Sequence, residues 1–151
     1  MIASIMCAAA LGADVHVELV VGEGATEAWA VPYTESFSKK IGPLQAGKTT
    51  ASYVVTMQPS VWDPLTGSFR VDVAVCREWR KKGKEPGRYC QKEQLVARTE
   101  AEGRTESTTN LAIAGEKYSY VLRTWYVGDP PGPVGLPGQE PATGGIEGGA
   151  P

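Results

Sequence analysis

The chain has 151 residues and a formal net charge of −2, from 15 basic and 17 acidic side chains. This length is typical of a single domain, and an apolar share of 42% is enough for a packed core. The near-neutral charge excludes the overall positive field that draws a protein to nucleic acid or to an anionic membrane. No apolar run of about 18 residues follows the N-terminus, so no membrane span is expected.

The first thirteen residues (MIASIMCAAALGA) form a short apolar stretch that ends in small residues, directly before the polar Asp14. This pattern is typical of a secretory signal, although the segment lacks the Lys or Arg of a usual n-region. We therefore interpret residues 1–13 as an export signal and expect an exported protein, periplasmic or extracellular. Two alternatives remain open: a buried N-terminal strand or helix, and a lipoprotein whose mature chain begins at Cys7.

Beyond Asp14, apolar and polar side chains alternate, which is the period of a half-buried β-strand. Turns rich in Gly, Pro, Asn and Asp separate the expected strands, which cover residues 15–21, 26–33, 51–58, 68–80, 88–99, 110–114 and 117–127. No stretch has a convincing 3.6-residue period, so little helix is expected. About seven short strands predict an all-β fold over residues 14–127: one antiparallel β-sandwich of the immunoglobulin-like or Greek-key type.

The C-terminal segment, residues 128–151, is more than half Gly and Pro and has little apolar bulk. Such a segment cannot offset the entropy of ordering by burying apolar surface. We expect a disordered tail, which serves either as a linker or tether or as an extension without a partner.

Without the signal segment the chain keeps two cysteines, Cys76 and Cys90, on either side of the charged turn KKGKEPG. If the chain reverses at Gly83, the two cysteines lie opposite each other on neighbouring strands. The sequence therefore predicts a Cys76–Cys90 disulfide, which implies an oxidising compartment. Closing a loop of about 15 residues contributes about 3 kcal/mol in the chain-entropy model.

Basic residues gather around the tip of this hairpin, next to Trp79 and Tyr89. They are Arg77, Arg80, Lys81, Lys82, Lys84, Arg88 and Lys92. We identify them as a candidate patch for an anionic partner, such as a polysaccharide, a lipid headgroup or an acidic protein surface. The alternative is a solubilising tip whose charge is partly neutralised by neighbouring glutamates.

Residues 42–49 (GPLQAGKT) match the phosphate-loop pattern G-x-x-x-x-G-K-[ST]. In that interpretation the nucleotide-binding residues are Gly42, Gly47, Lys48 and Thr49. A phosphate loop also needs a buried parallel strand before it and a helix after it. Because residues 36–41 are charged and residues 50–56 have the pattern of a strand, we favour a turn between strands that uses Gly47. Nucleotide binding stays as the alternative function.

His16 is the single histidine, so a catalytic triad or a zinc site lacks the necessary residues, and we expect no catalysis, metal or cofactor. Residues 53–75 resemble the strand–turn–strand pattern of bacterial secretins and related envelope β-domains. We expect a non-catalytic exported β-sandwich that acts as a binding or structural module of a bacterial-type cell envelope. Its expected partner is another envelope or extracellular protein, or an anionic polymer at the basic hairpin.

Overall fold

The computed structural model describes residues 12–22 and 24–131, so most of the predicted export signal and of the predicted disordered tail lies outside the described residues. The elements follow in chain order: β1 (Ala13–Val21), β2 (Thr26–Pro32), β3 (Phe37–Ala46), β4 (Thr49–Met57), β5 (Val61–Asp63), β6 (Ser68–Lys81), β7 (Gly87–Ala97), a 3-10 turn η1 (Glu100–Glu102), β8 (Thr105–Ile113) and β9 (Glu116–Gly128). The described residues are therefore all-β, as predicted.

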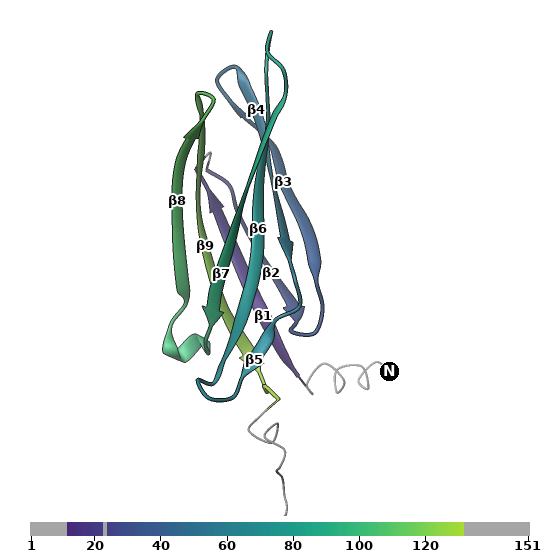
Figure 1. Ribbon diagram of the computed structural model, residues 1–151, viewed down its shortest axis with the longest axis vertical. Helices are drawn as coiled ribbons and strands as arrows, with labels where there is room; N and C mark the ends of the chain where they lie inside the picture. Colours follow the sequence, from purple (N-terminus) through teal and green to yellow (C-terminus); the bar gives the residue numbers. More distant parts are fainter. Residues whose placement is uncertain (1–11, 23, 132–151) are drawn as a thin grey trace, which may run out of the picture.

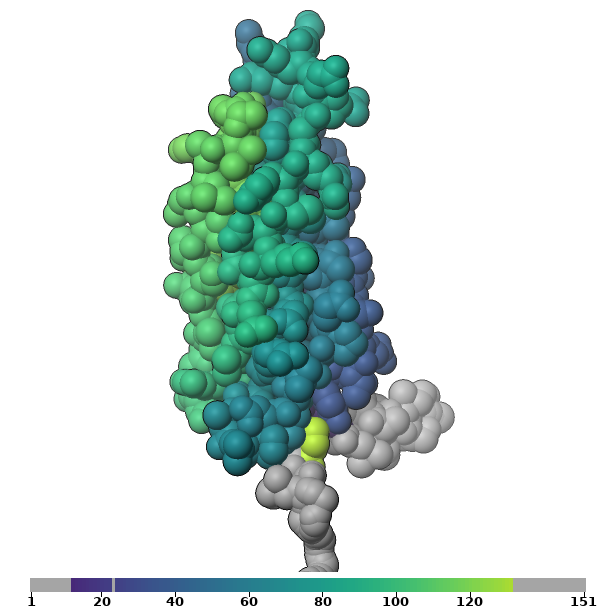
Figure 2. Space-filling model, in the orientation of Figure 1, coloured from purple at the N-terminus to yellow at the C-terminus, as the bar shows by residue number. Residues whose placement is uncertain are grey.

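The strands form two antiparallel sheets. Sheet A has the order β2-β1-β9-β8, and sheet B has the order β3-β4-β6-β7, with β5 beside the start of β6 (Figure 1). The two sheets pack face to face and confirm the predicted β-sandwich. The molecule is elongated, and the β6–β7 hairpin projects at one end of it (Figure 2).

The strand order differs from the Greek-key connections expected from the sequence. Around the molecule, consecutive strands lie next to each other, and the first strand closes the ring by pairing with the last, with Val15 opposite Tyr126. The chain passes between the sheets at residues 33–36 and at residues 98–104. These connections are short, and each joins an edge strand of one sheet to an edge strand of the other. Among the described strands the result is an up-and-down meander.

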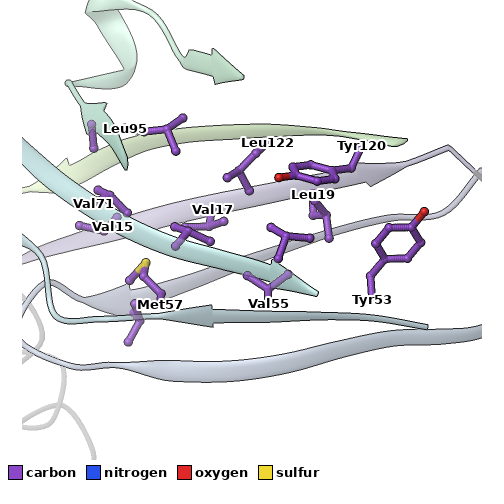
Figure 3. Close-up of a cluster of buried hydrophobic side chains, with 14 of the residues drawn as sticks. Val15, Val17, Leu19, Tyr53, Val55, Met57, Val71, Leu95, Tyr120 and Leu122 are labelled. Carbon is purple, nitrogen blue, oxygen red and sulfur yellow. The ribbon is translucent and has the colours of Figure 1, made fainter. Parts of the chain in front are cut away.

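The core forms where the alternating apolar side chains of both sheets meet. In β1 every second residue from Ala13 to Val21 is buried, and in β6 the inward side chains include Val71, Val73 and Val75. Figure 3 shows Val15, Val17 and Leu19 facing the side chains of sheet B. Fully burying a side chain of this kind contributes about 1.5–3 kcal/mol, so this layer carries most of the stability.

The two long sides of the sandwich are closed differently. Between β7 and β8, the Glu93 carboxylate accepts hydrogen bonds from Ser107 Oγ at 3.1 Å, Thr109 Oγ1 at 3.0 Å and Tyr120 Oη at 2.6 Å. On the opposite side, the rings of Trp29 on β2 and Phe37 on β3 pack with centroids 5.8 Å apart. Hydrogen bonds thus connect the two sheets along one side, and an aromatic contact connects them along the other.

Candidate functional site

The β6–β7 hairpin carries the predicted disulfide. Cys76 lies opposite Cys90 in the strand register, and the two sulfurs are bonded. The bond lies on the outer face of sheet B, because Cys76 alternates with the inward-facing Val75. It joins the two strands covalently at a point between the sandwich and the hairpin tip.

The structure separates the predicted basic residues into groups. Arg80, Lys82, Lys84, Arg88 and Lys92 are exposed. Arg88 Nε lies 3.1 Å from Glu78 Oε2. Lys92 is farther down β7, where it pairs with Ala74 and lines a separate shallow groove, of about 520 Å³, on the outer face of sheet B. Lys92 and the cations near the tip therefore line different grooves.

Arg77 is placed inside the sandwich rather than on the predicted surface patch, with only 2% of the residue exposed. Its Nε donates to Tyr53 Oη at 3.1 Å, and its Nη1 lies 3.8 Å from Glu116 Oε1. The guanidinium also lies 5.8 Å from the centre of the Tyr53 ring and 5.6 Å from that of Trp79. Arg77 thus links β6 to β4 and to the β8–β9 hairpin, and it supports the hairpin end from within.

Buried tyrosines lie below Arg77. The Tyr118 ring packs against Tyr53 and Tyr89, with centroids 6.3 Å and 5.4 Å apart, and its hydroxyl donates to the Val75 carbonyl. Burial raises the pKa of Tyr118 well above its ordinary value. Burial, reinforced by the hydrogen bond to Glu93, also raises the pKa of Tyr120. Both hydroxyls therefore stay protonated in the folded protein at neutral pH.

Trp79 lies between two grooves at the hairpin end. The indole lies over Gly87 on the opposite strand, where a Cβ would come within 2.3 Å of the ring. One groove, of about 550 Å³, runs along the outer face of sheet B and includes Thr50, Arg80 and Arg88. The second, of about 270 Å³, lies between this hairpin and the β8–β9 hairpin and includes Lys81, Lys84 and Glu116. Trp79 is half-buried, and it lines both grooves together with their cations.

The residues of the phosphate-loop pattern belong to the β3–β4 hairpin. β3 runs through Ala46, with a bulge between Ile41 and Leu44 and a cis peptide bond before Pro43. Gly47 and Lys48 form the turn, and Gly47 has the positive φ of 63° that a two-residue turn uses at its first position. Thr49 begins β4, so an antiparallel hairpin stands where a phosphate loop requires a parallel strand and a helix.

This hairpin adds a cation that the sequence did not assign to the basic group. Thr49 pairs with Lys81, so the turn that carries Lys48 lies beside the β6–β7 hairpin (Figure 1). The β8–β9 hairpin brings Lys117 to the same end, and Glu116 in this hairpin also lies 3.6 Å from Lys81 Nζ. We call residues 47–50, 77–88 and 114–117 the basic end. It holds eight of the 15 Lys and Arg residues and only three of the 17 Asp and Glu residues.

The single histidine lies on the outer face of sheet A. The ring of His16 stacks on Trp125 with centroids 5.1 Å apart, and the Arg104 guanidinium lies 3.8 Å from the centre of a Trp125 ring. Arg104 and Arg123 each lie within ion-pair distance of Glu18. These contacts cover Trp125 and hold neighbouring strands together. The contacts of His16 are therefore packing contacts.

Within residues 12–22 and 24–131, no group of three or more His, Cys, Asp or Glu side chains is arranged to hold a metal ion. No helix in that part of the chain has the length and apolar character needed to cross a membrane. No family model, curated protein or solved structure matches the chain.

Proposed function

We propose that the protein is an exported, non-catalytic binding module whose basic end takes an anionic polysaccharide. The observation that carries this proposal is the charge distribution: a chain with net charge −2 concentrates eight cations against three acids at one end. A local positive field of this kind attracts a polyanion even when the whole molecule is acidic. Sugar rings pack against aromatic side chains, and the half-buried Trp79 lines both grooves.

The Cys76–Cys90 bond supports the exported location, because disulfides persist in oxidising compartments. The bond also pre-organises the hairpin that presents the cations, which lowers the entropy lost on binding. Both ends of the described chain lie at the opposite end of the sandwich from the basic end (Figure 1). Both ends of the described chain are therefore remote from the surface that a partner in the cell envelope or outside the cell would contact.

Retention on immobilised heparin, a sulfated polysaccharide, tests the proposal. The test variant is Arg80→Glu/Lys82→Glu/Lys84→Glu; Lys81 is kept because it pairs with Glu116. The matched control, Lys39→Glu/Lys40→Glu/Arg98→Glu, changes the charge equally at exposed residues outside the basic end. We expect at least a tenfold loss of affinity in the test variant and a much smaller loss in the control. Equal losses, or a wild-type protein that passes through the column at about 0.1 M salt, would refute the assignment.

A further inference from the structure

The free edge of β2 is an unused hydrogen-bonding surface. β2 pairs with β1 on one side and with no described strand on the other. Val21 N donates to the Ala25 carbonyl and Tyr33 N donates to the Ala13 carbonyl. Because such pairs alternate in an antiparallel ladder, the odd-numbered residues of β2 direct their backbone groups toward β1. The even-numbered residues Thr26, Ala28 and Ala30 direct theirs outward, and all three residues are exposed.

The edges of β3, β7 and β8 are protected against pairing with a further strand. β3 carries Lys39 and Lys40 and a bulge beside the cis Gly42–Pro43 bond. β7 and β8 cover each other, and Thr105 Oγ1 donates to the Val96 carbonyl at 2.6 Å. Charged side chains, bulges and coverage are the usual ways in which proteins prevent edge pairing. β2 has only one charged residue, Glu27, and its proline, Pro32, is its last residue.

We propose that β2 pairs antiparallel with β2 of a second copy of the chain, across a twofold axis at Ala28. In this register Ala28 lies opposite its own counterpart, and Thr26 lies opposite Ala30 of the second copy. Each of these pairs exchanges two N–H···O=C bonds. Pro32, which has no N–H, falls outside the paired segment. Short side chains meet on the exposed face, so the edge is complementary to itself, as a twofold interface requires.

The dimer has a consequence for binding. A twofold axis between antiparallel strands reverses one copy relative to the other, so the two basic ends point in opposite directions. The four-stranded sheet A of each copy continues into that of the other. One dimer can therefore join two anionic chains, or two sites on one chain, and gain the effective concentration of a bivalent binder.

Sedimentation velocity with charge-swap variants tests the pairing. The wild type is expected to move from one to two times its chain mass of 16.1 kDa as its concentration rises. Ala28→Lys and Ala28→Glu each place like charges directly across the axis, so each is expected to weaken self-association at least tenfold. An equimolar mixture of the two is expected to associate again, because opposite charges then face each other. This recovery separates a broken interface from a misfolded variant.

Ser38→Lys and Ser38→Glu on the edge strand β3 are the matched controls and are expected to associate like the wild type. A wild type that stays monomeric up to about 1 mM overturns the proposal, since its free energy of association would then be less favourable than about −4 kcal/mol. Charge-swap variants that dimerise as well as the wild type also overturn it. Heparin retention of a monomeric variant is measured separately, so failure of this proposal and failure of the proposed function are distinguishable.

Discussion

Replacing Arg77 by Met tests whether the basic end is supported by a buried cation. Met keeps most of the aliphatic packing but removes the hydrogen bond to Tyr53 and the charge that faces Glu116, whose side chain is only 10% exposed. Removing one partner of a buried ion pair costs about 3–5 kcal/mol. Glu116 keeps Lys81 at 3.6 Å, so we expect the lower limit, about 3 kcal/mol. For a domain of about 115 residues this lowers Tm by about 12 °C.

Urea denaturation followed by tryptophan fluorescence measures this cost, with the disulfide intact in every variant. Lys81→Met is the matched control, because it removes the other cation near Glu116 from a side chain that is 43% exposed. Such partly exposed pairs contribute about 1 kcal/mol or less. A double-mutant cycle of Arg77→Met with Glu116→Gln should show positive coupling. If Arg77→Met lowers the free energy of unfolding no more than Lys81→Met does, the idea that the buried Arg77 supports the basic end is wrong.

Three further changes have defined outcomes. Burial raises the pKa of Tyr118 and Tyr120, so the unfolded chain loses these protons near pH 10 while the folded chain keeps them. Stability is then complete below pH 10 and falls above it, with each of these two tyrosines contributing about 1.4 kcal/mol per pH unit, so Tyr118→Phe should reduce the slope by about that amount in alkaline urea titrations. Gly87→Ala forces a Cβ against the Trp79 indole and should cost about 1–3 kcal/mol, with a changed tryptophan emission; an unchanged spectrum would contradict the packing. Cys76→Ser/Cys90→Ser should lower the free energy of unfolding by about 3 kcal/mol, and no loss would show that the loop closure contributes nothing.

The sequence predicted the elements whose burial follows their own residue pattern. One face of the strand lies in the core in each of β1, β4, β6 and β9. Such strands have apolar side chains at every second position, and this period of two is visible in the sequence. The disulfide followed from the symmetry of Cys76 and Cys90 about the turn. β3 was missed because most of its residues are exposed and it contains two lysines and a Gly-Pro pair. Its conformation depends on pairing with β4, which is a tertiary effect rather than a local preference. β5 is three residues long, too short to show a period.

The candidate site was predicted in part. The exposed cations of the hairpin were found, because charge clusters are visible in the sequence. Arg77 was assigned by its charge, although its position in the alternation, two residues after Val75, already indicates an inward side chain. Strand pairing brings Lys48 and Lys117 to the basic end. Both are far from residues 77–88 along the chain, so the sequence did not indicate that they belong to the same surface. The strand order could not be predicted either. The alternation of apolar and polar residues shows which face of a strand is buried, but it does not show which strands lie next to each other.

The pairing of β1 with β9 sets the order in which the two sheets can be completed. Sheet B is a meander of strands close in sequence, so its contacts need little loop closure and are expected to form early. Sheet A cannot close until Val15 finds Tyr126, more than 100 residues later. The first strand of the domain therefore gains its second neighbour only with the last strand, and one of its backbone edges stays unpaired until the final strand has been made.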